Sequence, residues 1–295
     1  MTIKHLIISG GGSIMVQILG AIQHLEKHKF LDISNIESIY GTSAGALVGI
    51  LICLKYDWET INDYIIKRPW HDVFNIKVQN ILDAYTNKGI FDIKIIEKCF
   101  KPLLDARDIP MDITLEEFYH LSKIELHLFS FEINAYKAID ISHLTHPNLQ
   151  LMTAVQMTCG IPILVSPVCI DNQCFIDGGV ICNYPLNYCI QSGKNEDDIL
   201  GFKNKYDDDT SCVNSESNLL DFLLNFLFKA IFSLSTTNIQ PPVKYEVICN
   251  ANYVNINNLR TALSNIETRK DLFNNGIESA TQFLSKLEDT VQELI

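Results

Sequence analysis

Residues 36–54 read IESIYGTSAGALVGILICL, and this stretch decides the fold. Residues 36–40 predict a short strand, and residues 46–54 predict a buried helix that is apolar on nearly every face. The Gly-Thr-Ser-Ala-Gly segment between them has the Gly-x-Ser-x-Gly spacing typical of a nucleophile elbow. Gly41 and Gly45 keep Cβ atoms out of this sharp turn. Ser43 is then expected at a helix N-terminus, where unpaired N–H groups favour developing negative charge.

The segment before the elbow has the same order of elements. Residues 3–9 predict a strand, Gly10, Gly11 and Gly12 form a turn, and residues 13–29 predict an amphipathic helix. Two successive strand-turn-helix units predict an α/β fold with a mainly parallel, doubly wound sheet.

The rest of the chain adds strands and helices without a clear linker or internal repeat. Strands are expected at residues 124–133, 174–176 and 198–203, and an edge strand at residues 243–250. Helices are expected over residues 57–108, with a break at Gly89, and over residues 259–294, and an exposed polar loop over residues 203–217. One domain over residues 1–295 is the economical interpretation, with a core at about 3–190 and a C-terminal helical extension at about 218–295.

Composition excludes some classes of binding partner and indicates the redox state of the cysteines. The 295 residues carry a formal net charge of −12, which argues against nucleic-acid binding and against electrostatic docking on anionic membranes. The nine cysteines include no C-x-x-C pair, and this spacing fits neither a zinc site nor a disulfide framework. We therefore expect reduced thiols in a cytoplasmic setting.

Two apolar segments bear on membrane contact. The N-terminal apolar run is too short for a signal peptide and enters a strand directly. The longest apolar stretch, residues 218–235, is interrupted every four residues by Asp221, Asn225 and Lys229. These three align as one polar stripe, so the stretch predicts an amphipathic helix and not a transmembrane span. Packing against the domain is the favoured role of this helix, and contact with a membrane surface is the alternative.

The glycine turn at residues 10–12 is a candidate anion site, because backbone N–H groups in such a turn can form a nest. A P-loop needs Gly-Lys-[Ser/Thr] at the end of its loop, and no lysine stands there. A dinucleotide fingerprint needs a third glycine after two more residues, where Met15 stands. The turn therefore fits an oxyanion hole better than a phosphate cradle, and a nucleotide-binding protein is a minor alternative.

Asp177, with Gly178 and Gly179, follows a short predicted strand and supplies a candidate base for Ser43. A Ser-Asp-His triad in α/β-hydrolase order needs a histidine after the acid, and the last histidine of this chain is His146. A direct Ser–Asp dyad remains. The eight histidines also lack the spacing of a metal site such as H-E-x-x-H.

With these motifs in order, the chain resembles the patatin-like phospholipase family over about residues 5–190. The motifs are the glycine turn, the Gly-Thr-Ser-Ala-Gly elbow, the run from Gly160-Ile-Pro162 to Ser166-Pro167-Val168, and Asp-Gly-Gly continuing as Val-x-x-Asn-Tyr-Pro. The resemblance implies a three-layer α/β/α sandwich and lipid acyl hydrolase activity without a metal or other cofactor. It also implies that Ser43 is the nucleophile, that Asp177 is the general base, and that backbone amides around Gly11 and Gly12 form the oxyanion hole.

By the same resemblance, the expected partner is a lipid or acyl-ester substrate at a membrane or micelle surface. The expected location is cytoplasmic, with peripheral membrane association. The family usually reads Gly-Gly-Gly-x-[Arg/Lys]-Gly, whereas this chain has Ser13, Ile14 and Met15. This departure leaves a second interpretation open, in which an inactive fold of this kind binds lipid or a partner protein.

Overall fold

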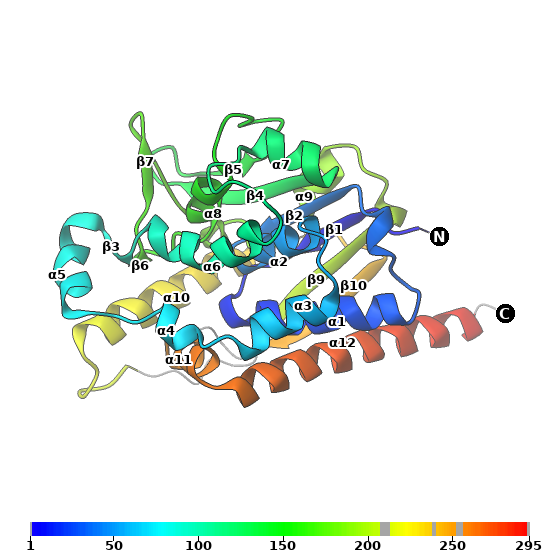
Figure 1. The fold of residues 1–295 in the computed structure, drawn as a ribbon. Helices are drawn as coiled ribbons and strands as arrows, with labels where there is room; N and C mark the ends of the chain where they lie inside the picture. Colours follow the sequence, from blue (N-terminus) through cyan, green and yellow to red (C-terminus); the bar gives the residue numbers. More distant parts are fainter. Residues whose placement is uncertain (1, 207–212, 238–239, 252–255, 294–295) are drawn as a thin grey trace.

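A computed structural model describes residues 2–206, 213–237, 240–251 and 256–293, and an eight-stranded sheet runs through them (Figure 1). Its strands are β1 (His5–Ile8), β2 (Ser38–Thr42), β4 (Glu125–Glu132), β5 (Lys137–Ile141), β7 (Val168–Ile170), β8 (Gln173–Asp177), β9 (Ile199–Tyr206) and β10 (Tyr245–Ala251). In space the order is β10-β9-β1-β2-β4-β8-β7, with β5 paired to β4. Neighbours from β10 to β4 are parallel, whereas β5, β7 and β8 pair antiparallel. The predicted mainly parallel sheet is confirmed.

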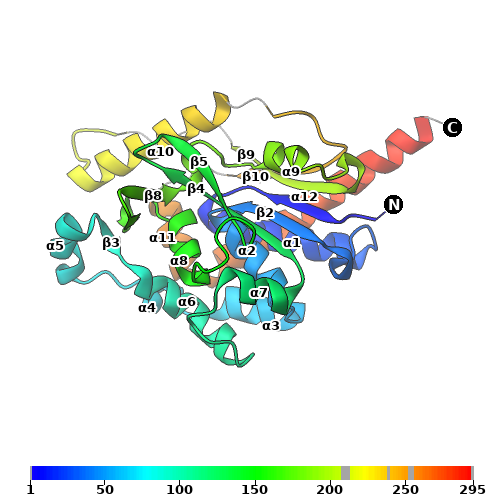
Figure 2. The ribbon, with the colours of Figure 1, turned by 90° about the horizontal axis from the view of Figure 1, so that it is seen from above.

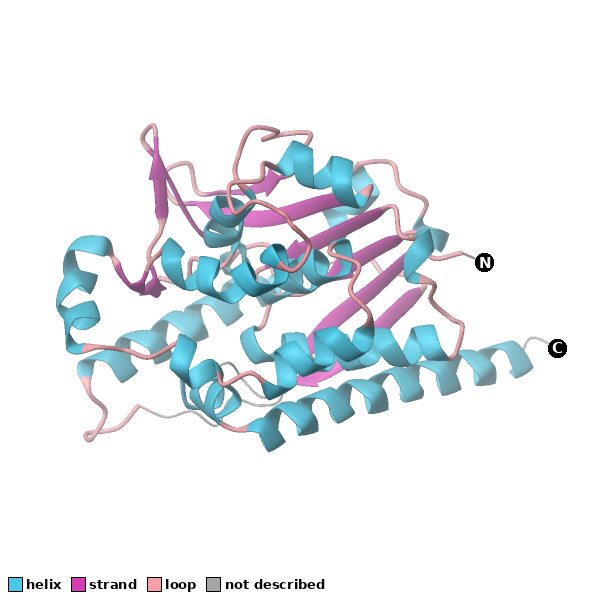
Figure 3. Cartoon of the chain, in the orientation of Figure 1, coloured by secondary structure: helices cyan, strands magenta, loops and turns pink. Residues whose placement is uncertain are grey.

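Helices connect and cover the strands (Figure 3). They are α1 (Met15–Lys27), α2 (Ala44–Cys53), α3 (Trp58–Asn62), α4 (Trp70–Val73), α5 (Val78–Asn87), α6 (Ile93–Asp105), α7 (Leu115–Ser122), α8 (Leu151–Thr158), α9 (Leu186–Gln191), α10 (Leu219–Thr237), α11 (Ile256–Ser264) and α12 (Ile266–Glu293). Shorter helical turns are η1 (Gly12–Ile14), η2 (Ile33–Asn35), η3 (Asp63–Lys67), η4 (Gly178–Val180) and η5 (Glu196–Asp198). Two short strands, β3 (Gly89–Phe91) and β6 (Ile163–Val165), pair in a separate parallel sheet.

The side chains of β1 explain why helices lie on both faces of the sheet. Leu6 and Ile8 pack into the main core with residues of α1, α2 and α8, whereas Ile7 packs on the other face with residues of α9. Successive strand residues point to opposite faces, so a strand that is apolar at every position needs cover on both. The three-layer α/β/α arrangement is therefore confirmed. On the main-core side, α12 packs along α1 (Figure 1).

Three predicted segments differ from the structure. The region 57–108 is divided into several short helices, and Gly89 begins β3, where a Cβ would collide with the backbone of Ser166. The polar loop does not begin at Lys203, because β9 continues to Tyr206 in register with β10. The acidic residues 207–209 of that loop lie outside the described residues. The C-terminal helix is divided into α11 and α12, and residue 294 also lies outside the described residues.

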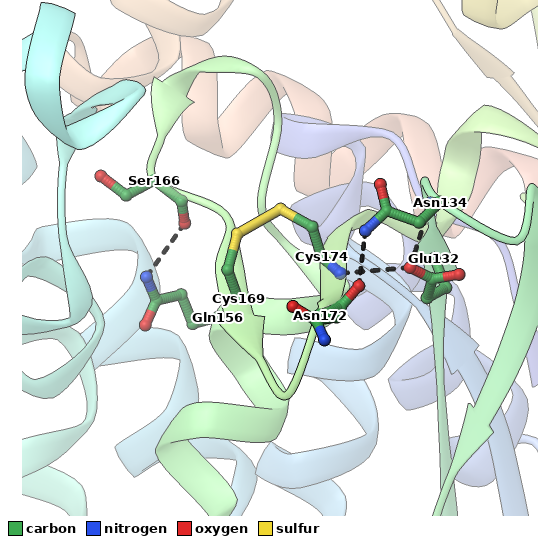
Figure 4. The surroundings of a disulfide bond; sticks show 7 residues. All are labelled: Glu132, Asn134, Gln156, Ser166, Cys169, Asn172 and Cys174. Carbon is green, nitrogen blue, oxygen red and sulfur yellow. Dashed lines mark hydrogen bonds between the residues drawn. A yellow bond between two sulfur atoms is a disulfide. The ribbon is translucent and has the colours of Figure 1, made fainter.

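The prediction of reduced thiols is wrong for one pair, because Cys169 and Cys174 form a disulfide between β7 and β8 (Figure 4). The two residues face each other in antiparallel register, with Cα atoms 4.1 Å apart. Asp171 and Asn172 at the turn both have positive φ, which is the geometry of a tight two-residue hairpin. Cysteine spacing alone does not reveal this hairpin. Figure 4 also shows Glu132 of β4 accepting a hydrogen bond from the Cys174 N–H, at 3.1 Å.

Helix α10 packs against the rest of the chain, as predicted, through Leu224 and Phe228. Its polar stripe lies only partly on the solvent face, since Lys229 is exposed but Asp221 and Asn225 are half-buried, while the apolar Phe226 is exposed. Within the described residues, none of the helices has the length and apolar content needed to cross a membrane.

Candidate active site

The turn between β2 and α2 holds Ser43 in a strained backbone conformation. Ser43 has φ 51° and ψ −119°, a region that costs a non-glycine residue about 1–3 kcal/mol. Residues with a Cβ atom would not fit at the two glycine positions beside Ser43. At Gly45 a Cβ would collide with the carbonyl oxygen of Ile8, and at Gly41 it would lie 2.7 Å from the Gly45 carbonyl carbon. The two glycines therefore allow α2 to start directly at the sheet edge, with Ser43 at its N-cap.

Ser43 Oγ donates a hydrogen bond to Asp177 Oδ2 at 2.6 Å, although the two residues are 134 positions apart. Asp177 ends β8, whose pairing with β4 brings it to the same edge of the sheet as Ser43. The fit is close, because a Cβ at Gly178 would collide with the carbonyl oxygen of Phe129. Ser43 is 8% exposed and Asp177 is 5% exposed. The structure thus brings together the two side chains that the sequence singled out.

Burial raises the pKa of Asp177 to about 6, although hydrogen bonds from Ser43 and from the backbone of Gly179 oppose this rise. The Gly179 N–H donates to Asp177 Oδ1 at 2.7 Å, which leaves Oδ2 directed at Ser43. A general base is most effective when its pKa lies near the working pH. The environment of Asp177 therefore makes this carboxylate a stronger base than an exposed aspartate.

The glycine turn lies directly against Ser43. A Cβ added to Gly10 would lie 3.1 Å from the Ser43 Cβ and 2.7 Å from Asn183 Oδ1. The Gly10 N–H donates to the carbonyl oxygen of Asn183 at 3.1 Å. Gly12 has φ 59°, which favours glycine. Within the described residues, the N–H groups of Gly11 and Gly12 make no hydrogen bond, so they are available to a ligand.

Several polar side chains that the sequence did not single out hold this arrangement. The carbonyl oxygen of Gly10 accepts hydrogen bonds from Asn204 Nδ2 at 2.6 Å and from Asn183 Nδ2 at 3.2 Å. Thr158 Oγ1 accepts the Ser43 N–H at 2.9 Å and donates to the carbonyl oxygen of Phe129 at 2.6 Å. Asn183 stands in the Asn-Tyr-Pro run and could have been noticed there. No local sequence pattern identifies Thr158 or Asn204. The contacts of Thr158 depend on the packing of α8, and those of Asn204 depend on the pairing of β9 with β1.

Apolar side chains border the dyad. An apolar cluster joins α10, α11, the end of β9 and the segment after Gly160. Leu224 and Phe228 are its buried members, and the partly buried side chains packed against them are Ile161, Ile163, Leu164, Tyr206 and Leu259. The segment and the dyad are linked, since the Asp177 N–H donates to the carbonyl oxygen of Gly160 at 3.1 Å. A Cβ at Gly12 would meet Leu259, so the cluster also reaches the glycine turn. Ile14 and Met15 pack into the main core instead.

Metal ligands do not gather in this part of the molecule. In the described segments of the chain, no three His, Cys, Asp or Glu side chains come together in a way that could hold a metal ion. Two of the buried histidines bond elsewhere, His127 to Asp140 at 2.8 Å and His5 to Ser38 at 2.8 Å.

The chain is similar to known proteins in sequence and in fold. The family model described as "Patatin-like phospholipase" matches residues 6–190. The chain is 25% identical over 190 residues to "Probable lipid hydrolase 463L" of Invertebrate iridescent virus 6, which covers 64% of this chain and 63% of that protein. It is 26% identical over 175 residues to triacylglycerol lipase ptl3 of Schizosaccharomyces pombe, which covers 54% of this chain and 33% of the lipase. The matches thus span less than two thirds of the length of these two relatives.

A similar fold occurs in VipD from Legionella pneumophila. The crystal structure of VipD matches with a TM-score of 0.61 at 17% identity, over 97% of this chain and 67% of VipD. At this level of identity the similarity concerns the fold.

Proposed function

The chain belongs to the patatin-like phospholipase family, and from this premise we propose that it is a serine lipid acyl hydrolase of the phospholipase A or esterase type. Ser43 is the proposed nucleophile and Asp177 the proposed general base. The observation that carries this proposal is the 2.6 Å hydrogen bond between them, at a strained strand-to-helix turn. A nucleophile within hydrogen-bond reach of a base is the arrangement that nucleophilic catalysis requires.

In the proposed reaction, Asp177 takes the proton of Ser43 Oγ as the oxygen attacks the ester carbonyl. The leaving alcohol then receives this proton, and an acyl-serine intermediate remains. A water molecule gives its proton to Asp177, attacks the acyl group and releases the fatty acid, and the proton returns to Ser43. Each step uses only the two side chains, the ester and water, so the proposal assigns no role to a metal or a cofactor.

The oxyanion of each tetrahedral intermediate is proposed to bind at the N–H groups of Gly11 and Gly12. Support comes from the position of Gly10 against Ser43 and from the two amides that have no other hydrogen bond in the described residues. Gly10 supplies the turn itself rather than a donor, because its N–H is bonded to Asn183. Loss of one oxyanion donor typically lowers the rate by roughly 100- to 1,000-fold.

A lipid ester is the proposed substrate class. The cluster around Leu224 and Phe228 supplies apolar surface beside the dyad, where an acyl chain would be removed from water. The names of the two relatives above, a lipid hydrolase and a triacylglycerol lipase, point the same way. The substrate is proposed to be reached at a membrane or micelle surface, by a protein located in the cytoplasm.

The test measures fatty-acid release from mixed phospholipid vesicles in the presence of EDTA. The wild type is compared with Ser43→Ala and Asp177→Asn, and a fluorophosphonate probe tests whether Ser43 is reactive. Release by the wild type, loss in both variants and labelling of Ser43 would support the proposal. Absence of release and of labelling in the folded wild type would contradict it and would favour the alternative of a lipid- or protein-binding module.

A further inference from the structure

Helix α5 turns its apolar face to solvent. Val78, Ile81, Leu82 and Tyr85 follow the i, i+3, i+4, i+7 spacing of one helix face. Leu82 is 65% exposed and Tyr85 is 95% exposed, and no residue of α5 is buried. A helix with this pattern normally buries its apolar face against the core. Here the face has no cover within the described residues.

Helix α10 is apolar on two opposite sides. One side packs inward through Leu224 and Phe228. The opposite side carries Leu219, Phe222, Leu223 and Phe226, all of them exposed, and Phe226 is 66% exposed. The polar residues Asp221 and Asn225 lie between the two sides. Packing within the chain therefore explains one apolar face of α10 and leaves the other unexplained.

The two exposed faces occur at one end of the molecule. Figures 1 and 2, seen from directions 90° apart, both place α5 and the N-terminal half of α10 at the same end. The elements between them are in contact: α5 packs on β3, β3 pairs with β6, and Ile163 of β6 packs with Leu224 of α10. We call the exposed residues of both helices the α5–α10 surface; they are Val78, Ile81, Leu82, Tyr85, Leu219, Phe222, Leu223 and Phe226.

This surface lies next to the candidate active site. Helix α10 contacts η4, the turn that follows Asp177, and Ile231 of α10 packs on Ile176 and Val180. The inward side of the same helix contributes Leu224 and Phe228 to the apolar cluster beside the dyad. A ligand held on the outer side of α10 is thus one helix thickness from the proposed acyl-chain contacts.

Taken together, the two segments that carry the surface have no net charge. The whole chain has a net charge of −12, but the charges within residues 74–91 and 213–237 balance, with Lys77, Lys88 and Lys229 against Asp83, Glu216 and Asp221. An anionic bilayer would attract a basic helix and would repel a chain of this overall charge. A zwitterionic bilayer matches a neutral apolar surface, because it exerts little net electrostatic force and accepts apolar side chains at the boundary of its headgroups.

We propose that the α5–α10 surface docks on zwitterionic lipid bilayers, with the exposed side chains of both helices inserted at the interface. The proposal rests on the lipid hydrolase function proposed above and adds the surface by which the protein reaches its substrate. An interfacial helix is recognised by one apolar face and one polar face lying in the plane of the membrane, and α5 has both. Docking would bring the bilayer to α10, the helix that also contacts the turn after Asp177.

The test uses the Ser43→Ala background, which keeps the lipid intact, and co-sedimentation with vesicles of dioleoyl phosphatidylcholine alone. Leu82→Gln and Phe226→Gln remove apolar contact without adding charge, and Leu144→Gln is the matched control, since Leu144 is 66% exposed but lies in the turn after β5. We expect each surface variant to weaken partitioning by roughly tenfold and the control to bind as the parent does. Thermal melts check that all variants are folded.

A second experiment measures insertion into the bilayer directly and does not depend on loss of binding. With Tyr85→Trp, insertion predicts a blue-shifted emission and quenching by lipids brominated on the acyl chain. Hydrolysis of a short soluble ester, measured in enzymes that retain Ser43, tests the hydrolase proposal separately from the docking proposal. Leu82→Gln and Phe226→Gln are expected to leave this hydrolysis unchanged.

Three outcomes would overturn the docking proposal. One is wild-type ester hydrolysis without vesicle binding, which leaves the hydrolase function standing. Another is binding that requires anionic lipid. The third is a dimer in solution that Leu82→Gln or Phe226→Gln dissociates, because the surface would then be an interface between two copies of the chain.

Discussion

Asn204 of β9 donates from Nδ2 to the carbonyl oxygen of Gly10 at 2.6 Å across 194 residues of sequence. This contact fixes the orientation of the peptide that joins Gly10 and Gly11. In a planar trans peptide, the N–H points away from the carbonyl oxygen, so Asn204 also determines where the Gly11 N–H is directed. The family motif has a basic residue and a fourth glycine in this turn, and this chain has neither. Asn204 and Asn183 hold the turn from neighbouring segments instead.

We therefore expect Asn204→Leu to lower kcat by about tenfold with little change in KM, because a misdirected N–H stabilises the oxyanion less well. Tyr206→Phe is the matched comparison. Its hydroxyl lies 3.5 Å from the same oxygen and accepts a hydrogen bond from Asn204 Nδ2 at 3.3 Å. Both contacts are longer than the 2.6 Å bond from Asn204 to Gly10, so loss of the hydroxyl should change kcat by less than about threefold. Steady-state kinetics on a soluble ester measure both. A change confined to KM, or equal losses in the two variants, would argue against this positioning role.

The rate should depend on the ionisation of Asp177. The base must be ionised to accept the serine proton, and burial raises its pKa to about 6. We expect kcat/KM on a soluble ester to rise from pH 5 to pH 7 with a midpoint near pH 6, and then to level off. An exposed aspartate would place this midpoint near pH 4. A flat profile between pH 5 and pH 8 would contradict the assignment of Asp177 as the base.

The same shift makes a prediction about stability. The pKa of Asp177 is about 6 in the folded chain against 3.8 when unperturbed, so between these pH values the folded state binds more protons than the unfolded state. Wild-type stability contributed by this group therefore falls as the pH rises from about 4 to 6. An asparagine side chain does not titrate. The free energy of unfolding of Asp177→Asn, taken relative to that of the wild type, should therefore rise by up to about 3 kcal/mol between pH 4 and pH 7. Urea unfolding at both pH values measures the difference, and a gain that does not change with pH would contradict it.

The sequence singled out Ser43, Asp177 and the glycine turn because the patterns that mark them are local. Each of Ser43, Asp177 and the glycine turn follows a recognisable strand. The C-terminal end of β8, which runs antiparallel to β4, lies beside the C-terminal end of β2, because Asp177 pairs with Ser130 and Thr42 with Phe129. Their roles remain predictions until the kinetics are measured. Thr158 and Asn204 could not be found in this way, since each contact depends on which elements become neighbours in space.

The exposed face of α10 could not be predicted from the sequence either. The polar stripe at Asp221, Asn225 and Lys229 identified an amphipathic helix, but it left apolar residues on two sides. Periodicity cannot show which of two apolar sides packs inward. Likewise, the Cys169–Cys174 pair depends on the hairpin turn rather than on cysteine spacing. Strands β9 and β10 lie beyond the predicted core at about residues 3–190 and complete the sheet, which supports our proposal that residues 1–295 form one domain.

Two glycines of α2, Gly45 in the elbow and Gly49 outside it, offer a matched test of how closely α2 approaches the sheet. Gly45 and Gly49 both lie in α2, where alanine is intrinsically favoured by about 1 kcal/mol. At Gly45 the added Cβ would collide with the backbone oxygen of Ile8, which cannot move without disturbing β1. At Gly49 it would meet only the side chains of Leu126 and Ile39, the nearer at 2.9 Å, and these can adjust. We expect Gly45→Ala to lower the free energy of unfolding by about 3 kcal/mol or more, and Gly49→Ala to lower it by less than half as much. Chemical denaturation of both variants decides the point, and equal losses would show that helix packing in general, rather than the contact at the elbow, requires glycine.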